Sequence, residues 1–312
     1  MTKREIDICI CTFQREHILE TLKSIDQMNM DPNWFLRVIV ADNDETPSSK
    51  KAVEVFAQNL SFPVTYTHAP ARNISIARNA CLNESKAALV AFIDDDEIAD
   101  KKWLKEMLSK IDASKADAVL GHVKAIYLED CPQWIIDGDF YSHSATYVRG
   151  EITTGYSGNL LLNQTSEPFK GRRFSLELGQ TGGEDSSFLK NAYRAGAKIE
   201  YAPNAIVSEI IPSERTTLSW LLRRRFRAGQ THGMMLEETT GKSFSAKVKN
   251  ILLASAKSCI SISAAPFFIL KKHRFYFWIC RAVMHAGVVA HLIGKATLVQ
   301  YGQDSKEPSK SH

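Results

Sequence analysis

The sequence contains no glycine before Gly121. Walker-type phosphate loops and dinucleotide-binding fingerprints both need glycines shortly after a first strand, because the backbone must come close to a phosphate. Neither kind of loop can therefore form in the N-terminal part of the chain. If this part binds a phosphorylated ligand, a metal ion and arginine side chains must meet the charge, and Arg15 and Arg78 are the candidates.

The sequence also lacks the marks of a secreted or nucleic-acid-binding protein. Its six cysteines show no C-x-x-C spacing, and no hydrophobic stretch of signal-peptide type follows Met1, so we expect a reducing, cytoplasmic compartment. Ten Lys and Arg residues stand against two acids from Ser243 onward, whereas the first 242 residues carry 29 against 33. This distribution argues against a nucleic-acid partner, whose basic patch should lie on the folded body, and fits a C-terminal region that meets anionic lipid.

Strand-like and helix-like segments alternate over the first third of the chain. Strands are predicted at residues 6–13, 35–41, 64–67 and 89–93, and helices at 18–25, from Thr46-Pro47, at 75–82 and from Asp100. This alternation predicts a mostly parallel sheet with helices on both faces. On the first strand, Cys9 and Cys11 are expected to be buried thiols.

The strand predicted at residues 89–93 runs directly into Asp94, Asp95 and Asp96. Open α/β sheets bind their ligands at the edge where strands end, so these carboxylates lie where a ligand is expected. Carboxylates this close repel one another unless a cation lies among them, and Mg²⁺ typically takes one or two carboxylates plus phosphate oxygens. The alternative is a solvated turn followed by a helix cap at Asp100.

Five short motifs along the chain resemble those of the glycosyl transferases of family 2, inverting enzymes built on the GT-A fold. The motifs are Cys11-Thr12-Phe13-Gln14-Arg15, Ala41-Asp42-Asn43, residues 73–80 (NISIARNA), Asp94-Asp95-Asp96 and Gly183-Glu184-Asp185. Each motif is weak alone, but their order and spacing over roughly residues 5–230 are specific together. Within the family, the chain resembles the glucosyltransferases that assemble bacterial exopolysaccharides such as succinoglycan.

The resemblance implies roles for individual residues around a UDP-sugar and a divalent metal ion, Mg²⁺ or Mn²⁺. The substrate-binding residues are Thr12 and Phe13 against the nucleotide, Asp42 at the uracil, Arg15 and Arg78 at base or diphosphate, Asp94 at the ribose, and Asp95 and Glu184 nearby; Asp96 is the metal ligand. Ordinary turn chemistry is the alternative for Thr12 and Asp42, and a surface salt bridge is the alternative for Arg78.

Asp185 is the residue that the resemblance makes the general base. Sugar transfer with inversion needs one carboxylate that accepts the proton of the acceptor hydroxyl, opposite the departing nucleotide. Gly182 and Gly183 would let the backbone pass close to the acceptor, and a helix is predicted over residues 186–195. The alternative is that Asp185 only caps this helix.

One motif departs from the family pattern, and a few further residues are candidates for the site. Processive members carry Q-x-x-R-W, whereas residues 222–227 read LRRRFR, which favours addition of one sugar per acceptor. These arginines could bind diphosphate or form a basic helix face near lipid. His232 is a minor candidate for the metal site, with a structural role as the commoner outcome for a lone histidine. Residues 155–159 are expected to shape the acceptor floor, and Trp134 to stack on a sugar or, more simply, to pack in the core.

The last quarter of the chain combines apolar runs with basic residues. Residues 258–270 are uncharged, and residues 275–294 are apolar except for Arg281, His285 and His291. Twenty residues could span a bilayer, but an internal arginine is costly there. We therefore expect an amphipathic helix lying in the plane of the cytoplasmic face of a bacterial inner membrane, with packing against the catalytic domain as the alternative.

These observations predict a GT-A domain over residues 1–242, with a nucleotide-sugar half over about 1–100 and an acceptor half over about 101–242. A helical membrane-associating region over 243–300 and a disordered tail over 301–312 follow. The expected function is transfer of one sugar, with glucose favoured, from a UDP-sugar to a growing, lipid-linked oligosaccharide. Two alternatives are a sugar-1-phosphate nucleotidyltransferase, which would need a glycine-rich loop, and a non-catalytic nucleotide-sugar-binding scaffold, which would not need Asp185.

Overall fold

A computed structural model describes residues 4–240 and 243–298 of the chain, so the predicted disordered tail lies outside the described residues. The described residues form two compact units. The first unit contains residues 4–123 and 144–208, and the second contains residues 124–143, 209–240 and 243–298.

The first unit is built around an eight-stranded sheet with the order β3-β2-β1-β4-β9-β6-β10-β5. The strands are β1 (Arg4–Thr12), β2 (Trp34–Asp42), β3 (Val64–His68), β4 (Leu89–Ile93), β5 (Glu97–Ala99), β6 (Ala118–Tyr127), β9 (Asn159–Asn163) and β10 (Ile199–Ile211). A separate two-stranded hairpin consists of β7 (Tyr147–Val148) and β8 (Glu151–Ile152). The ends of β6 and β10 continue into the second unit.

The sheet is parallel at one side and mixed at the other. Strands β3, β2, β1 and β4 run parallel, as the strand–helix alternation predicts, whereas β9 runs antiparallel to both β4 and β6. The prediction of a mostly parallel sheet therefore holds for the N-terminal strands only. Beyond β4 the run of parallel neighbours ends, because β9 is inserted between β4 and β6 and runs antiparallel to both.

Helices cover both faces of this sheet, and β1 shows why. Its side chains alternate, so Ile6, Ile8 and Ile10 join one core cluster while Cys9 and Cys11 join the other. The first cluster contains residues of α1 (Ile18–Asp26), α2 (Lys50–Ala57) and α4 (Trp103–Ser114). The second contains residues of α3 (Ile74–Glu84) and α6 (Glu184–Arg194), and Cys9, Cys11 and Cys81 are buried free thiols there, as predicted for the first two.

Two of the predicted helix starts meet different outcomes. The prediction from Thr46-Pro47 is wrong, because residues 46–49 form a turn and α2 begins at Lys50. The Asp42 carboxylate fixes this later start by accepting the N–H of Ser49 at 3.0 Å. Asp100 is not the cap of α4, whose N-cap residue is Lys102, but its side chain accepts the N–H of Lys102 at 2.9 Å.

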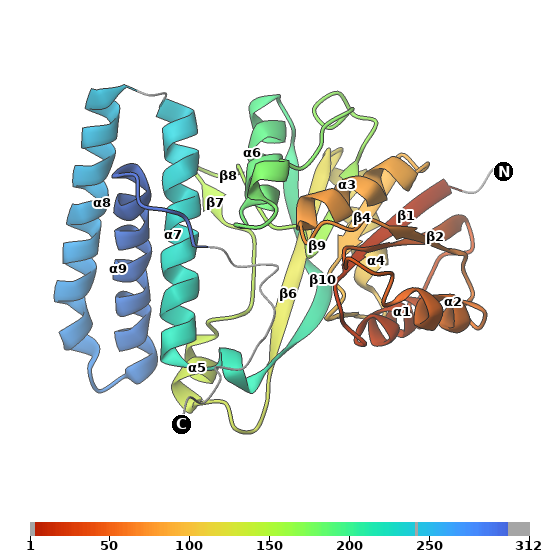
Figure 1. Cartoon of the computed structure of the whole chain (residues 1–312), viewed down its shortest axis with the longest axis horizontal. Coiled ribbons are helices and arrows are strands. Elements are labelled where there is room, and N and C mark those ends of the chain that lie inside the picture. The colour runs from red at the N-terminus through yellow and green to blue at the C-terminus, as the bar shows by residue number, and fades with distance from the viewer. Residues whose placement is uncertain (1–3, 241–242, 299–312) are drawn as a thin grey trace. The chain divides into compact units, whose positions relative to one another are not determined.

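The second unit is mainly helical. It contains α5 (Gln133–Gly138), α7 (Leu218–Thr240), α8 (Phe244–Ala264) and α9 (Lys272–Leu292), with short 3₁₀ turns η2 (Ser213–Arg215) and η3 (Ala265–Phe268). Figure 1 shows α7, α9 and α8 side by side, and the contacts agree, since α9 packs against both other helices. The remaining short 3₁₀ turn, η1 (Leu176–Leu178), belongs to the first unit.

Glycines let α7 and α9 approach closely. A Cβ atom on Gly229 would collide with the carbonyl oxygen of Met284, and one on Gly287 would collide with the carbonyl oxygen of Phe226. The predicted helix over residues 275–294 is present as α9, and its position in a membrane plane stays a prediction. His285 is 7% exposed, and the buried side of α9 packs within the helical unit.

The predicted domain boundary after residue 242 differs from the division into compact units. Helix α7, predicted to end the catalytic domain, belongs with α8 and α9 because its glycines pack against α9. That residues 1–242 act as one catalytic domain stays a prediction.

We expect Gly287→Ala to destabilise the helical unit. Alanine in a helix interior normally gains about 0.5–1 kcal/mol over glycine. Here the added methyl group meets the Phe226 carbonyl, a backbone atom that cannot rotate away, so we expect a net loss of about 1–3 kcal/mol. Denaturant titration of the variant checks this against Ala286→Ser at the exposed neighbouring position, where the change should stay within about 0.5 kcal/mol. A more stable Gly287→Ala protein would contradict the close approach.

Candidate active site

Three neighbouring parallel strands end at the same edge of the sheet. Strand β1 ends at Thr12, β2 ends at Asp42, and β4 is followed by the acid turn, which we define as Asp94, Asp95 and Asp96. Thr12 lies opposite Asp42 in the β1–β2 register, and its hydroxyl donates to Asp95 Oδ2 at 2.8 Å. The predicted convergence of these strand ends is confirmed.

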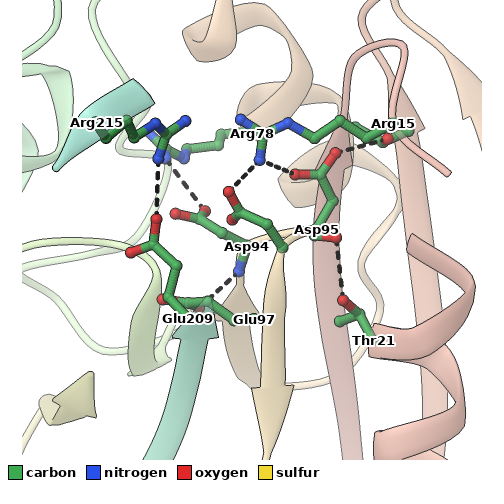
Figure 2. Close-up of polar contacts among 10 residues, drawn as sticks. Arg15, Thr21, Arg78, Asp94, Asp95, Glu97, Glu209 and Arg215 are labelled. Carbon is green, nitrogen blue, oxygen red and sulfur yellow. Dashed lines mark hydrogen bonds and ion pairs between the residues drawn. The ribbon is translucent and has the colours of Figure 1, made fainter. Parts of the chain in front are cut away.

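Asp95 is the fixed centre of the acid turn. Its side chain accepts from the Thr12 hydroxyl at 2.8 Å. The side chain also accepts from Arg15 Nη1 at 3.0 Å, and its carbonyl oxygen accepts from the Thr21 hydroxyl at 3.1 Å (Figure 2). Burial raises the pKa of Asp95 to about 7, although the Arg15 guanidinium opposes the rise and Asp96 adds to it. Asp95 therefore braces the turn, while its neighbours are the more accessible carboxylates.

Asp94 and Asp96 each face an arginine. Arg15 Nη1 donates to Asp96 Oδ2 as well as to Asp95, and Arg78 Nη2 lies 3.7 Å from Asp94 Oδ1. The side chain of Asp94 is 44% exposed and that of Asp96 is 23% exposed, against 7% for Asp95. Desolvation raises the pKa of Asp94, and repulsion by Asp96 adds to the rise while Arg78 opposes it.

Arg78 joins the acid turn to the start of helix α6. It lies on α3, whose N-terminus is capped by the Asn73 side chain, and its side chain is 8% exposed. Its Nη1 donates to Glu184 Oε1, and its guanidinium carbon lies 5.6 Å from the centre of the Phe174 ring. Arg78 is thus a buried bridge between Asp94 and Glu184, and the alternative of a surface salt bridge is excluded for it.

Asp185 stands next to this bridge, in the first turn of α6. Gly183 is the N-cap residue, and the Asp185 carboxylate accepts only the N–H of its neighbour Ser186 among the hydrogen bonds of the described residues, at 2.6 Å. Asp185 is therefore not the cap of the helix. Burial raises the pKa of Asp185 to about 7, and repulsion by Glu184 adds to the rise while Arg78 opposes it. A carboxylate with such a pKa is well matched to general-base catalysis near neutral pH.

Glu184 contributes one carboxylate oxygen to Arg78 and leaves the other buried. Its Oε2 atom has no hydrogen-bond partner within the structure as described, and the residue is 3% exposed. A buried unpaired carboxylate oxygen costs free energy unless a ligand or water satisfies it. Glu184 therefore fits its predicted place at a substrate.

Residues 154–158 line the space between the acid turn and α6. The Thr154 hydroxyl donates to the carbonyl oxygen of Ser186 at 2.9 Å, and the Ser186 hydroxyl donates to that of Gly155 at 3.0 Å. A Cβ atom on Gly158 would lie 2.9 Å from Asp94 Oδ2 and 2.9 Å from Glu97 Oε1. The expectation that this segment forms a floor to the site fits these contacts.

The sequence interpretation missed Glu97. This carboxylate is 3% exposed and accepts the backbone N–H of Asp94 at 2.9 Å, while the N–H of Glu97 donates to the Asp94 carbonyl at 3.2 Å (Figure 2). The reciprocal pair fixes the shape of the acid turn. Its sequence signal, a fourth acid three residues after the first, could have been recognised as turn chemistry.

Asp42 differs most from its predicted role. It is fully buried, with one oxygen accepting the N–H of Asp44 at 3.0 Å and the other accepting from Ser49 and from the Tyr66 hydroxyl at 2.7 Å. Both oxygens hold the loop between β2 and α2, so the turn-chemistry alternative describes Asp42 in this structure. Contact with a uracil stays a prediction. Phe13 is half-buried, and the guanidinium carbon of Arg72 lies 5.9 Å from its ring centre.

The acids fit a divalent cation that a substrate completes. Within residues 4–240 and 243–298, no group of three or more His, Cys, Asp or Glu side chains is arranged to hold a metal ion by itself. Asp94 and Asp96 nevertheless offer partly exposed, hard oxygen donors at the end of β4. Magnesium needs only one or two such carboxylates when phosphate oxygens and water supply the rest.

Three further candidates lie in the second unit. Trp134 packs against Phe140 and Tyr276, with ring centres 5.6 and 4.2 Å apart, so core packing is its role. Within the basic run of α7, Arg224 Nη2 contacts His143 at 2.7 Å, and Arg225 donates to the carbonyl oxygen of Phe140 at 2.9 Å. His232 is exposed on α7, and its predicted part in a metal site stays a prediction.

Known proteins resemble this chain in both sequence and fold. The succinoglycan biosynthesis protein ExoM of Rhizobium meliloti (strain 1021) is 43% identical over 297 residues, which cover 95% of this chain and 96% of that protein. The poly(ribitol-phosphate) beta-N-acetylglucosaminyltransferase TarS of Staphylococcus aureus (strain Mu50 / ATCC 700699) is 25% identical over 130 residues, or 41% of this chain and 22% of TarS.

Crystal structures of S. aureus TarS residues 1–349 share the fold. One superposes with a TM-score of 0.52 at 16% identity, covering 91% of this chain and 92% of that one, and the complex with UDP-GlcNAc gives 0.51 at 16% identity. The predicted GT-A fold is confirmed by this likeness. The model of the family described as "Glycosyl transferase family 2" matches residues 7–165, about half of the chain. The protein is a glycosyltransferase, and its chain belongs to glycosyl transferase family 2.

Proposed function

We propose that this enzyme transfers one sugar, with glucose favoured, from a UDP-sugar to a growing, lipid-linked oligosaccharide in bacterial exopolysaccharide biosynthesis. The near full-length similarity to a succinoglycan biosynthesis protein supports the exopolysaccharide part of this proposal. TarS structures in complex with UDP and with UDP-GlcNAc support a uridine nucleotide sugar as donor.

One observation carries the proposal. Within the first unit, the Glu184–Arg78–Asp94 chain of ion pairs ties the helix that carries Asp185 to the turn that ends β4. A base and a leaving-group site must lie on opposite sides of one reacting carbon atom, at a fixed separation. Arg78 is buried and pairs with a carboxylate on each of these two elements, so it can hold them at a fixed separation.

The transfer inverts the configuration of the donor's anomeric carbon in a single displacement. Asp185 accepts the proton of the acceptor hydroxyl. At the same time the oxygen of that hydroxyl bonds to the anomeric carbon, and the bond from the anomeric carbon to the UDP phosphate oxygen breaks. Arg15 and Arg78 stabilise the negative charge that develops on the departing diphosphate. A divalent ion held by Asp96, with Asp94 beside it, would neutralise more of that charge when bound.

The structure bears on both alternative functions. A nucleotidyltransferase would need a glycine-rich loop after β1, but residues 13–16 read FQRE and contain no glycine. A scaffold that only binds a nucleotide sugar has no use for a carboxylate with the raised pKa of Asp185. Acid–base catalysis is therefore the better account of the site.

We also propose that the enzyme lies on the cytoplasmic face of the inner membrane. Two stretches, Phe244–Phe268 and Lys272–Leu292, are long and apolar enough to cross a membrane by length and composition alone. The first stretch is the more exposed, since 17% of its most apolar part is buried, compared with 39% for the second. Residues 243–298 contain eight Lys and Arg and no acid, which suits an anionic lipid surface.

The turn between α8 and α9 is the most exposed apolar part of this region. Phe267 is 87% exposed and Leu270 is 96% exposed, and Lys271 and Lys272 follow directly. An apolar tip bordered by cations can insert its side chains among lipid tails while the cations bind headgroups. The proposed attachment is therefore through α8 and this tip, with α9 serving as the core of the helical unit.

Asp185→Asn tests the proposed base. The change keeps the shape of the side chain and removes its basicity, so kcat should fall by about 10²–10⁴-fold while donor affinity changes little. The assay is transfer from labelled UDP-sugars to lipid-linked oligosaccharide extracts, with UDP binding measured in parallel. NMR of the product should show inversion, and a product that retains the donor's configuration would refute the mechanism.

The raised pKa of Asp185 predicts the pH dependence. The base must be deprotonated, so kcat/KM should rise about tenfold per pH unit below about 7 and level off above it. An ordinary carboxylate would place this limb near pH 4. The residual activity of Asp185→Asn should lack the limb. If the limb persists there, Asp95, whose pKa is also raised to about 7, would be responsible and the assignment to Asp185 would be wrong.

Replacing the apolar tip should weaken membrane binding. We expect the double variant Phe267→Ser, Leu270→Ser to lose at least about tenfold in partition onto anionic vesicles, since each buried apolar side chain contributes about 1.5–3 kcal/mol. Val55→Ser, at a position 56% exposed on α2, is the matched control and should bind like the wild type. Cosedimentation measures both. Binding unaffected by the tip variant would place the attachment elsewhere or exclude it.

A further inference from the structure

We propose that Arg15 is an exchangeable counter-ion of the acid turn. In the ligand-free enzyme it neutralises Asp96, and it leaves Asp96 for the donor's diphosphate when a divalent cation and the nucleotide bind. The inference rests on the proposed function, because it requires a nucleotide diphosphate at this edge of the sheet. It adds a residue that controls when the enzyme binds its cation.

The backbone holds Arg15 at the acid turn. Gln14, the residue before it, has a φ of 54°, in the left-handed region that non-glycine side chains rarely adopt. The Gln14 side chain donates to Asp44 Oδ1 at 2.9 Å, which ties the segment after β1 to the loop after β2. A conformation that costs free energy and is held by a specific contact is a built feature of the site.

One nitrogen of Arg15 contacts both carboxylates. Nη1 lies 3.0 Å from Asp95 Oδ1 and also donates to Asp96 Oδ2, so a single positive group bridges two adjacent acids. Asp95 has other partners in Thr12 and in the fold around it, whereas the contact described for the Asp96 side chain is the one with Arg15. Asp96 is therefore the carboxylate that can change partners without breaking the turn.

The arginine and a divalent cation compete for the same charge. A cation bound at Asp96 would face the Arg15 guanidinium at close range, and this repulsion opposes cation binding while Arg15 stays in place. Arg15 has room to move, since its side chain is 39% exposed. A guanidinium that leaves a carboxylate can pair in bidentate fashion with phosphate oxygens, which recovers the lost hydrogen bonds.

The exchange couples the two ligands. In the ligand-free protein the cation has to displace Arg15 from Asp96, and no phosphate group is present to pair with the displaced arginine. The affinity for the cation is therefore low. A bound diphosphate receives the arginine and raises that affinity, and by linkage the cation raises nucleotide affinity by the same factor. Such couplings are typically about 5- to 150-fold.

Arg15→Gln separates this role from a structural one. Calorimetric titration with Mn²⁺ alone, and with UDP in the presence and absence of Mn²⁺, gives the affinities and their coupling. In the variant we expect Mn²⁺ alone to bind at least about fivefold more tightly than in the wild type, and UDP with Mn²⁺ to bind more weakly. Arg15→Lys, which keeps the charge, should keep the weak cation binding of the free wild type.

Arg4→Gln is the matched control. Arg4 forms an ion pair of the same kind with Asp112, at 2.7 Å, at the opposite ends of the strands, and its loss should change neither affinity. Circular dichroism confirms that each variant is folded. Free Arg15→Gln that binds Mn²⁺ no more tightly than the wild type overturns the exchange. If the wild-type protein binds UDP equally well with and without Mn²⁺, the exchange is also wrong, but the proposed UDP-sugar donor still stands. If the wild-type protein binds no UDP at all, the proposed function is refuted as well.

Discussion

The repulsion among five acids at one edge of the sheet is the constraint on which the site depends. Asp94, Asp95 and Asp96 follow β4, and Glu184 and Asp185 begin α6. Two arginines balance them, Arg15 from the turn after β1 and Arg78 from α3. Burial raises the pKa values of Asp94, Asp95 and Asp185, and repulsion among these acids adds to the rise while the arginines oppose it. The ligand-free site is therefore poised to take up positive charge and to accept a proton.

The two arginines differ in a way that matters for chemistry. Arg78 is 8% exposed and pairs with both Asp94 and Glu184. It therefore belongs to the framework that holds the base, Asp185, in place relative to the acid turn. Arg15 is 39% exposed and holds its acids with one nitrogen, which leaves it free to exchange. A site that must bind a highly charged donor and then release an equally charged product benefits from one fixed and one movable cation.

The second unit contains two apolar helices that differ in their burial. Helix α9 is apolar because it packs between α7 and α8, with glycines at the closest approach. Helix α8 and the turn after it are apolar and exposed, and no acid lies between residues 243 and 298. Similar hydropathy thus has two causes in neighbouring helices, and only burial tells them apart.

The sequence by itself determined the strand–helix alternation, the ends of the parallel strands and the acids that follow them. These are local matters, because side-chain periodicity and the carboxyl ends of parallel strands are set by backbone geometry. Asp94 and Asp96 could for this reason be named in advance as candidates, whereas Asp185 and the individual roles came from the family resemblance.

Only the tertiary structure decided which partners these groups have. That Asp42 holds Tyr66 and that one side of α9 packs between α7 and α8 depend on contacts between segments distant in the sequence. The pairing of Arg78 with Glu184 joins residues 106 positions apart, and no local pattern specifies it. Charges and hydropathy are properties of a sequence, but burial and pairing, which set the pKa values and the exposed surfaces, arise only when the chain folds.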